Sequence, residues 1–79
     1  MKRYENLSGN SGVVAYEIGD GWIIVEFEGD ASATARRYRY TAASAGAHAV
    51  SEMQRLARAG RGLATFVSRQ HPQYENDRR

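Results

Sequence analysis

The stretch GDGWIIVEFE, residues 19–28, carries the strongest structural signals in the chain. Gly19, Asp20 and Gly21 accept backbone conformations with positive φ, and such residues are typical of a tight β-hairpin turn. The residues that follow, WIIVEFE, are dense in the β-branched and aromatic side chains that favour strands. The stretch therefore predicts a hairpin turn that leads into a strand.

Two further strands are predicted on either side of this stretch. GVVAYEI, residues 12–18, is rich in strand-forming residues and precedes the turn. After GDASA at 29–33, a loop of small residues, the segment TARRYRYT at 34–41 has the composition of a third strand. Three strands that follow one another through short connections predict an antiparallel meander.

The alternation of side chains along the strands predicts what each face of the sheet carries. Ile23, Val25 and Phe27 share one side of the second strand, whereas Tyr38 and Tyr40 share one side of the third. Pairing these two sets would bury the tyrosine rings and leave their hydroxyls near the rim. We therefore expect Tyr38 and Tyr40 to be core residues.

The opposite side of the same strands carries Arg37 and Arg39 from the third strand and Glu26 and Glu28 from the second. Opposite charges on neighbouring strands stabilise a sheet by about 0.2–1 kcal/mol per pair. The two arginines therefore either pair with the glutamates or contact a ligand, and the sequence leaves both interpretations open.

Helical spacing replaces the strand pattern after Ala42. An apolar stripe predicts a helix over about residues 46–59, formed by Val50, Met53, Leu56 and Ala57. Ser44 is the expected N-cap of this helix and Gly60 its stop. A second, shorter helix that ends before Pro72 is indicated by Leu63, Phe66 and Val67.

These elements predict an α+β fold, namely a three-stranded antiparallel meander (β-β-β) followed by two helices packed on one face. A chain of 79 residues is close to the smallest size at which one core is self-sufficient. We expect a partly ordered N-terminal segment at 1–11, a single domain at 12–71 and a polar tail at 72–79.

The composition excludes several classes of protein. The absence of cysteine excludes a disulfide framework and a thiolate metal site. No apolar run approaches the roughly 18 residues that span a bilayer, and the N-terminus lacks the apolar region of a signal peptide. We expect a cytoplasmic protein with no membrane partner, no cofactor and no metal. Since no nucleophile elbow or phosphate loop is present, we expect no enzymatic activity.

The net charge of +2 is distributed unevenly along the chain. Residues 1–30 hold two basic and six acidic residues, a net charge of −4, whereas residues 31–71 hold seven arginines and one glutamate, a net charge of +6. A polyanion would be attracted by the second part and repelled by the first. The alternative is that the two parts neutralise each other across the folded sheet.

Arginines in the second half of the chain form the candidate nucleic-acid-binding residues. Arg55, Arg58 and Arg61 recur at i, i+3 and i+6, Arg69 can continue this row from the second helix, and Arg36 lies near the loop before the third strand. Guanidinium groups suit phosphate oxygens. The alternative is that the row is an ordinary solvated helix face.

Trp22 and Ile24 lie on the Glu26 side of the sheet and are a second candidate surface. An indole ring can stack on an unpaired base, so Trp22 could assist nucleic-acid binding. An apolar patch on a sheet face is also typical of a protein interface. The same two residues therefore support a second hypothesis, binding to a protein partner or self-association as a homodimer.

Residues 11–69 contain a series of short motifs. They are Val14 and Tyr16, then Val25, Phe27 and Gly29, then Tyr38 and Tyr40, then Val50, Leu56 and Ala57, then Gly62 and Phe66. In these motifs the chain resembles the KTSC domain family, small bacterial and phage domains that also occur at the C-terminus of some lysyl-tRNA synthetases. The stretch ARAGRG at 57–62 departs from the family's basic signature.

The resemblance implies an association with nucleic acid, inferred from the tRNA-synthetase context, and it does not imply a catalytic activity. Together with the arginines, it leads us to expect a non-enzymatic domain that binds RNA or single-stranded DNA weakly. The alternative is the protein-interaction or self-association module that uses Trp22 and Ile24.

Overall fold

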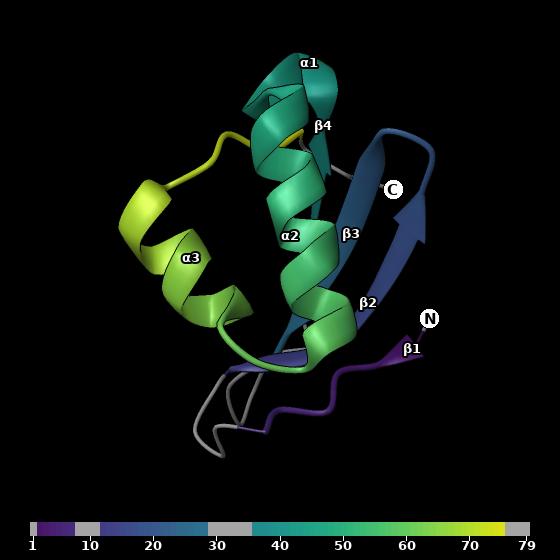
Figure 1. The fold of residues 1–79 in the computed structure, drawn as a ribbon, viewed down its shortest axis with the longest axis vertical. Coiled ribbons are helices and arrows are strands. Elements are labelled where there is room, and N and C mark those ends of the chain that lie inside the picture. Colours follow the sequence, from purple (N-terminus) through teal and green to yellow (C-terminus); the bar gives the residue numbers. More distant parts are fainter. Residues whose placement is uncertain (1, 8–11, 29–35, 76–79) are drawn as a thin grey trace.

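A computed structural model of the protein describes residues 2–7, 12–28 and 36–75. The described elements are β1 (Lys2–Arg3), β2 (Val13–Gly19), β3 (Trp22–Phe27), β4 (Arg36–Thr41), α1 (Ala42–Ala45), α2 (Ala47–Ala59) and α3 (Leu63–Gln70). The four strands form an antiparallel sheet in the order β1-β2-β3-β4, and α2 and α3 lie in front of it (Figure 1). The predicted α+β class is confirmed, but the described residues form one more strand and one more helix than predicted.

The predicted hairpin joins β2 and β3. Gly19 pairs with Trp22, so that Asp20 and Gly21 form the turn, and Gly21 has a φ of 84°. Helix α2 is fastened to this hairpin, because the Gln54 side-chain amide donates hydrogen bonds to the carbonyls of Gly19 (3.0 Å) and Trp22 (2.9 Å). The turn therefore fixes the register of the sheet and also positions the helix.

The pairing of β3 with β4 buries Tyr40 as predicted, but it buries Tyr38 only in part. Ile23 pairs with Tyr40 and Val25 pairs with Tyr38. Tyr40 is buried and Tyr38 is half-buried. The buried core beneath the helices consists of Tyr4, Val13, Tyr16, Ile23, Val25, Tyr40, Val50, Met53, Ala57 and Leu63.

The start of the helical region differs from the prediction. Ser44 is not the N-cap of α2 but lies in the short helix α1, where it forms a capping box with Thr41. The Thr41 side chain accepts a hydrogen bond from the Ser44 N–H, and the Ser44 side chain accepts one from the Thr41 N–H, both at 3.1 Å. Helix α2 begins after Gly46, and it ends at Gly60, which has a φ of 80°.

Residues 2–7 of the N-terminal segment, which we predicted to be partly ordered, are part of the fold, and residues 1 and 8–11 lie outside the described residues. Strand β1 pairs with β2, and the Leu7 N–H donates to the Gly60 carbonyl at 2.7 Å. Tyr4 is buried, its ring contacts Tyr16 edge-on, and its hydroxyl accepts a hydrogen bond from the Leu63 N–H at 3.3 Å. This aromatic anchor holds residues 2–7 against α3 and β2.

Residues 72–75 also belong to the fold, although we predicted a polar tail. The Glu75 N–H donates to the Arg39 carbonyl at 2.7 Å, and the Glu75 carboxylate accepts a hydrogen bond from the Thr41 hydroxyl at 2.8 Å. Tyr74 packs against Tyr38 and Tyr40. Residues 76–79 of the predicted tail, the predicted loop at 29–33 and Thr34 lie outside the described residues. None of the helices among the described residues has the length and apolar character needed to cross a membrane.

Candidate nucleic-acid-binding surface

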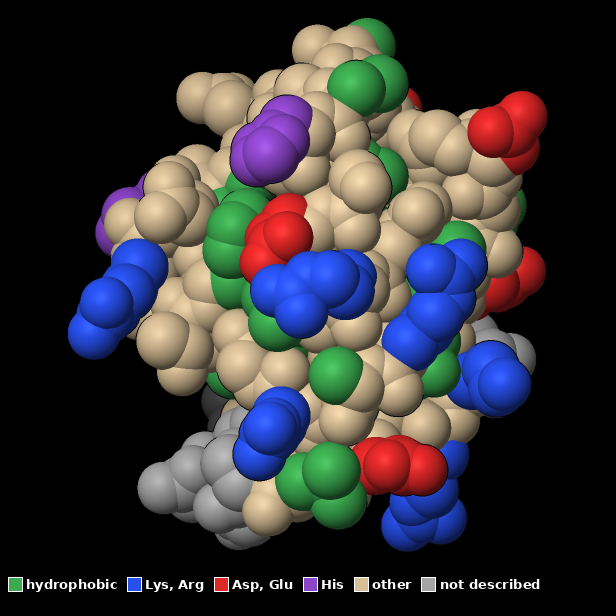
Figure 2. All heavy atoms as spheres, viewed as in Figure 1, with side chains coloured by type: hydrophobic (Ala, Val, Ile, Leu, Met, Phe, Trp, Pro, Cys, Tyr) green, Lys and Arg blue, Asp and Glu red, His purple; other side chains and the backbone are tan. Residues whose placement is uncertain are grey.

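The helix layer carries four of the five predicted nucleic-acid-binding arginines. Arg55 and Arg58 lie on α2, Arg61 lies in the turn between α2 and α3, and Arg69 lies in the last turn of α3. All four are exposed. Figure 2 shows Lys and Arg side chains gathered over α2 and on both sides of it, with acidic side chains between some of them. The arginines therefore share one side of the protein without forming an uninterrupted row.

Arg55 is paired with an acidic residue one turn earlier on α2. Its Nε donates to Glu52 Oε1 at 3.3 Å, and a second guanidinium nitrogen bonds to the other carboxylate oxygen. This hydrogen-bonded pair lowers the pKa of Glu52 and raises the pKa of Arg55. Glu52 thus neutralises part of the Arg55 charge, which makes Arg55 a weaker phosphate ligand than an unpaired arginine would be.

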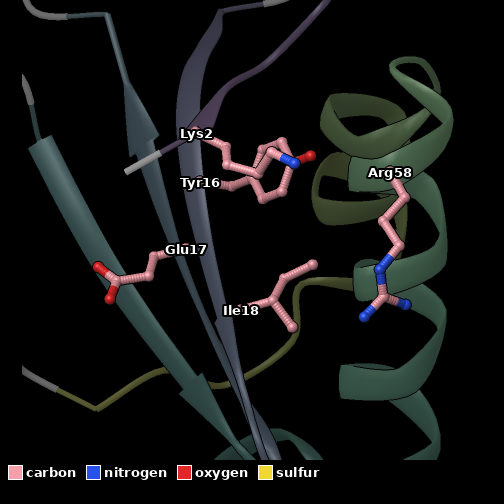
Figure 3. Close-up of a pocket in the computed structure, with 5 residues that line it drawn as sticks. All are labelled: Lys2, Tyr16, Glu17, Ile18 and Arg58. Carbon is pink, nitrogen blue, oxygen red and sulfur yellow. The ribbon is translucent and has the colours of Figure 1, made fainter.

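Arg58 borders an open groove between α2 and the edge of the sheet. The groove has a volume of about 580 Å³ and is lined by Lys2, Tyr16, Glu17, Ile18 and Arg58. Figure 3 shows Lys2 lying over the Tyr16 ring and Arg58 reaching toward Ile18, whereas Glu17 points to the opposite side of β2. The groove therefore combines an apolar floor with a cation on each wall, an arrangement that suits an anion.

Arg36 lies at a second open hollow, which is the most aromatic surface of the described protein. The hollow has a volume of about 390 Å³ and is lined by Gly12, Phe27, Glu28, Arg36, Tyr38, Tyr40, Val67 and Tyr74. We call it the aromatic hollow. The ring centroids of Phe27 and Tyr38 are 5.6 Å apart, those of Tyr38 and Tyr74 are 4.5 Å apart, and Tyr74 is 52% exposed. An exposed cation and an accessible ring thus line the same hollow.

The structure supports one of the two expected cross-strand ion pairs and not the other. Arg37 Nε lies 4.0 Å from Glu26 Oε1, which supports the interpretation as a cross-strand pair. Arg39 lies opposite Ile24 and is linked through its backbone to Glu75. Glu28 follows the end of β3 and lines the aromatic hollow with Arg36, so it is not a cross-strand partner of Arg39.

Trp22 and Ile24 lie on the sheet face that points away from α2 and α3. Ile23 and Val25 alternate with them along β3 and face the helices, where they are fully buried. The Trp22 ring covers Gly19, because a Cβ at Gly19 would collide with the indole ring. The predicted stacking residues are therefore not brought together with the arginines of the helix layer.

Burial changes the acidity of one tyrosine at the aromatic hollow. Burial, followed by the charges of Tyr38 and Tyr74 when these ionise, raises the pKa of Tyr40 to about 12. Its hydroxyl is therefore neutral at physiological pH. Among residues 2–7, 12–28 and 36–75, no group of three or more His, Cys, Asp or Glu side chains is arranged to hold a metal ion.

Phe27 and Tyr74 line the aromatic hollow but are not among the predicted site residues. Phe27 was assigned to the core, but it is only half-buried and borders the aromatic hollow. Tyr74 was assigned to the tail, although a lone aromatic residue among polar neighbours was a readable sign of a contact. Comparisons of the chain with family models, with curated proteins and with solved structures found no match.

Proposed function

We propose that the protein is a non-enzymatic binding domain for single-stranded nucleic acid, either RNA or single-stranded DNA. The observation that carries the proposal is the aromatic hollow, which is lined by both Arg36 and the accessible ring of Tyr74. Proteins that bind single strands combine such rings, on which bases stack, with cations that contact the phosphates. The KTSC resemblance stays a prediction, and it implies the same kind of partner.

One nucleotide fits the chemistry of the aromatic hollow in a definite way. Its base stacks on Tyr74, an interaction worth about 1–3 kcal/mol per base. The guanidinium of Arg36 contacts the adjoining phosphate, for which its planar, permanently charged fork is suited. Glu28 on the same wall offers an acceptor to an exocyclic amino group, as acidic side chains do with cytosine.

The neighbouring phosphates contact arginines of the helix layer. Val67 of α3 lines the aromatic hollow, and Arg69 lies in the last turn of the same helix on a different side of it. Arg61 and Arg58 extend the basic surface toward the groove beside Lys2. Because Glu52 neutralises part of the Arg55 charge, we expect Arg55 to contribute least. The small number of phosphate contacts predicts weak, salt-dependent binding.

A pair of adjacent arginines on β4 provides the matched test. Arg36 and Arg37 are both exposed, but they point to opposite faces of the sheet, and only Arg36 lines the aromatic hollow. Binding of a fluorescent single strand of mixed sequence is measured by anisotropy for Arg36→Ala and Arg37→Ala. Each variant loses one positive charge, so a difference in affinity reports position rather than net charge.

We expect Arg36→Ala to weaken binding about three- to tenfold, which corresponds to about 0.7–1.4 kcal/mol. It should also reduce the slope of log affinity against log salt by about 0.7, the value for one phosphate on a single strand. Arg37→Ala should change both quantities little. Equal losses of affinity in the two variants would show a non-specific attraction to charge. If the wild type binds no single strand at about 50 mM salt, the proposal is rejected.

A further inference from the structure

The groove between α2 and the edge of the sheet is separate from the aromatic hollow, and we call it the edge groove. Helix α2 packs on β3 and β4, and the edge groove lies beside it over β2, the next strand of the sheet. Its volume of about 580 Å³ lies within the range of about 300–1,000 Å³ that is usual for ligand pockets. It shares no lining residue with the aromatic hollow, so a ligand bound in it does not depend on the proposed function.

The floor of the edge groove is apolar. Ile18 pairs with Ile23, which is buried beneath the helices, so the half-buried Ile18 side chain points to the same side of the sheet. Tyr16, two residues earlier on β2, shares this side, but it is buried and the Tyr4 ring meets it edge-on. The Tyr16 ring therefore offers little surface on which a base could stack. The accessible part of the floor is aliphatic.

A cation stands on each side of this floor. Lys2 of β1 pairs with Tyr16 and so projects to the helix side of the sheet, and Arg58 reaches toward the floor from the last turn of α2 (Figure 3). Within the part of the chain that the structure describes, neither of the two side chains forms a hydrogen bond or an ion pair. The side chain of Glu17, the acidic residue that borders the groove, points to the opposite side of β2 (Figure 3). Both cations are thus free to bind an anion.

We infer that the edge groove binds an organic acid with an aliphatic chain, of which a medium-chain fatty acid is the simplest example. The carboxylate lies between the cations of Lys2 and Arg58, with which it forms charge-assisted hydrogen bonds. The aliphatic chain lies along Ile18, where its burial stabilises the complex. Because the groove is open and both cations are exposed, the dissociation constant for so small a ligand is in the millimolar range.

Four probes separate the contribution of the carboxylate from that of the chain. Proton–nitrogen chemical shifts of the wild type are recorded in titrations with octanoate, hexanoate, acetate and 1-hexanol at constant ionic strength. A fully buried CH₂ group tightens binding about fourfold, so a groove that covers about half of it should give about twofold per CH₂. We therefore expect octanoate to bind about fourfold more tightly than hexanoate. Acetate lacks the chain and 1-hexanol lacks the charge, so each should bind at least about tenfold more weakly than octanoate.

The position of the shifts identifies the site. We expect the amide shifts of Lys2, Ile18 and Arg58 to move together and saturate with octanoate. An octanoate affinity no greater than that of acetate would leave only an attraction between charges and would overturn the inference. Saturating shifts confined to Tyr38 and Tyr74 would place the acid in the aromatic hollow and would overturn it as well.

Lys2 and Arg3 provide a matched pair of variants on β1. Both are exposed, but Lys2 borders the edge groove, whereas Arg3 pairs with Ala15 and points to the sheet face opposite the helices, which we call the outer face. Lys2→Ala and Arg58→Ala should each weaken octanoate binding about threefold, and Arg3→Ala should change it less than about 1.5-fold. Each variant loses one positive charge, so equal losses in Lys2→Ala and Arg3→Ala would overturn the inference. The titrations of the wild type need no variant and test it independently.

Discussion

Replacing Tyr4 tests whether the N-terminal segment belongs to the core. Its side chain is 3% exposed, and its ring centroid lies 6.5 Å from that of Tyr16 in an edge-on contact. The Tyr4 hydroxyl accepts a hydrogen bond from the Leu63 N–H at 3.3 Å. Leu63 is the first residue of α3. The N-cap of this helix is Gly62, which has no side chain and so makes no side-chain cap hydrogen bond. Tyr4 thus supplies an acceptor that the local sequence of α3 lacks.

The two functions of Tyr4 give two expected magnitudes. Truncating a buried large aromatic residue costs about 3–5 kcal/mol, so we expect Tyr4→Ala to lose that amount. Tyr4→Phe keeps the ring but leaves the Leu63 N–H without this acceptor, which should cost about 1–2 kcal/mol. A chain of this size has a free energy of unfolding of about 4–12 kcal/mol. Tyr4→Ala should therefore remove a large share of the stability.

The free energy of unfolding is measured by urea titration with circular dichroism. Leu7→Ala is the control in the same segment, because Leu7 is 62% exposed and should contribute about 0.5 kcal/mol or less. With a slope near 1–1.5 kcal/mol per M urea, a loss of about 3–5 kcal/mol in Tyr4→Ala should lower the midpoint by about 2–5 M. A loss below about 1 kcal/mol for Tyr4→Ala, equal to that of Leu7→Ala, would refute the reasoning.

Three further predictions concern stability. Folding raises the pKa of Tyr40 from 10.0 to about 12 and so favours its protonated form. The contribution of this group to the free energy of unfolding should be complete below pH 10, and about 2–3 kcal/mol should be lost between pH 10 and 12. Urea midpoints measured against pH will show this loss, and the Tyr40→Phe variant should lack this part of it. Gly21→Ala should cost about 1–2 kcal/mol, because Gly21 has a φ of 84° and the new Cβ would meet only open space. Gly60→Ala should cost at least about 1 kcal/mol more, since its Cβ would lie 2.9 Å from Glu5 Cβ. Equal thermal shifts in the two variants would contradict this close contact. Gln54→Ala removes both hydrogen bonds to the hairpin carbonyls and should cost about 1–3 kcal/mol in the same titration, whereas a loss close to zero would mean that water replaces the amide there.

Features that depend on near neighbours in the chain could be predicted from the sequence. The hairpin turn at Asp20 and Gly21, the shared face of Tyr38 and Tyr40 and the end of α2 at Gly60 follow from backbone freedom and from alternation. Ser44 was expected to cap the longer helix, whereas it forms the capping box of α1 with Thr41.

Features that depend on distant contacts could not be predicted in this way. Tyr4 bonds to Leu63, and Tyr74 packs on Tyr38, so each contact joins segments that are far apart in the sequence. Strand β1 has two residues, too few to show alternation. The same limit applies to the site, because alternation placed Arg36 on the tyrosine side but gave no indication that Tyr74 returns to line the same hollow.

A chemical-shift titration tests the central claim, binding of a single strand at the aromatic hollow, most directly. Proton–nitrogen spectra are recorded while a pool of mixed RNA and DNA oligonucleotides is added at about 50 mM salt, where weak binders are visible. We predict that the shifts of Arg36, Tyr38, Val67 and Tyr74 move together and saturate, and that raising the salt reverses them. No change at these residues, or changes confined to Trp22 and Ile24 on the outer face, would contradict the account.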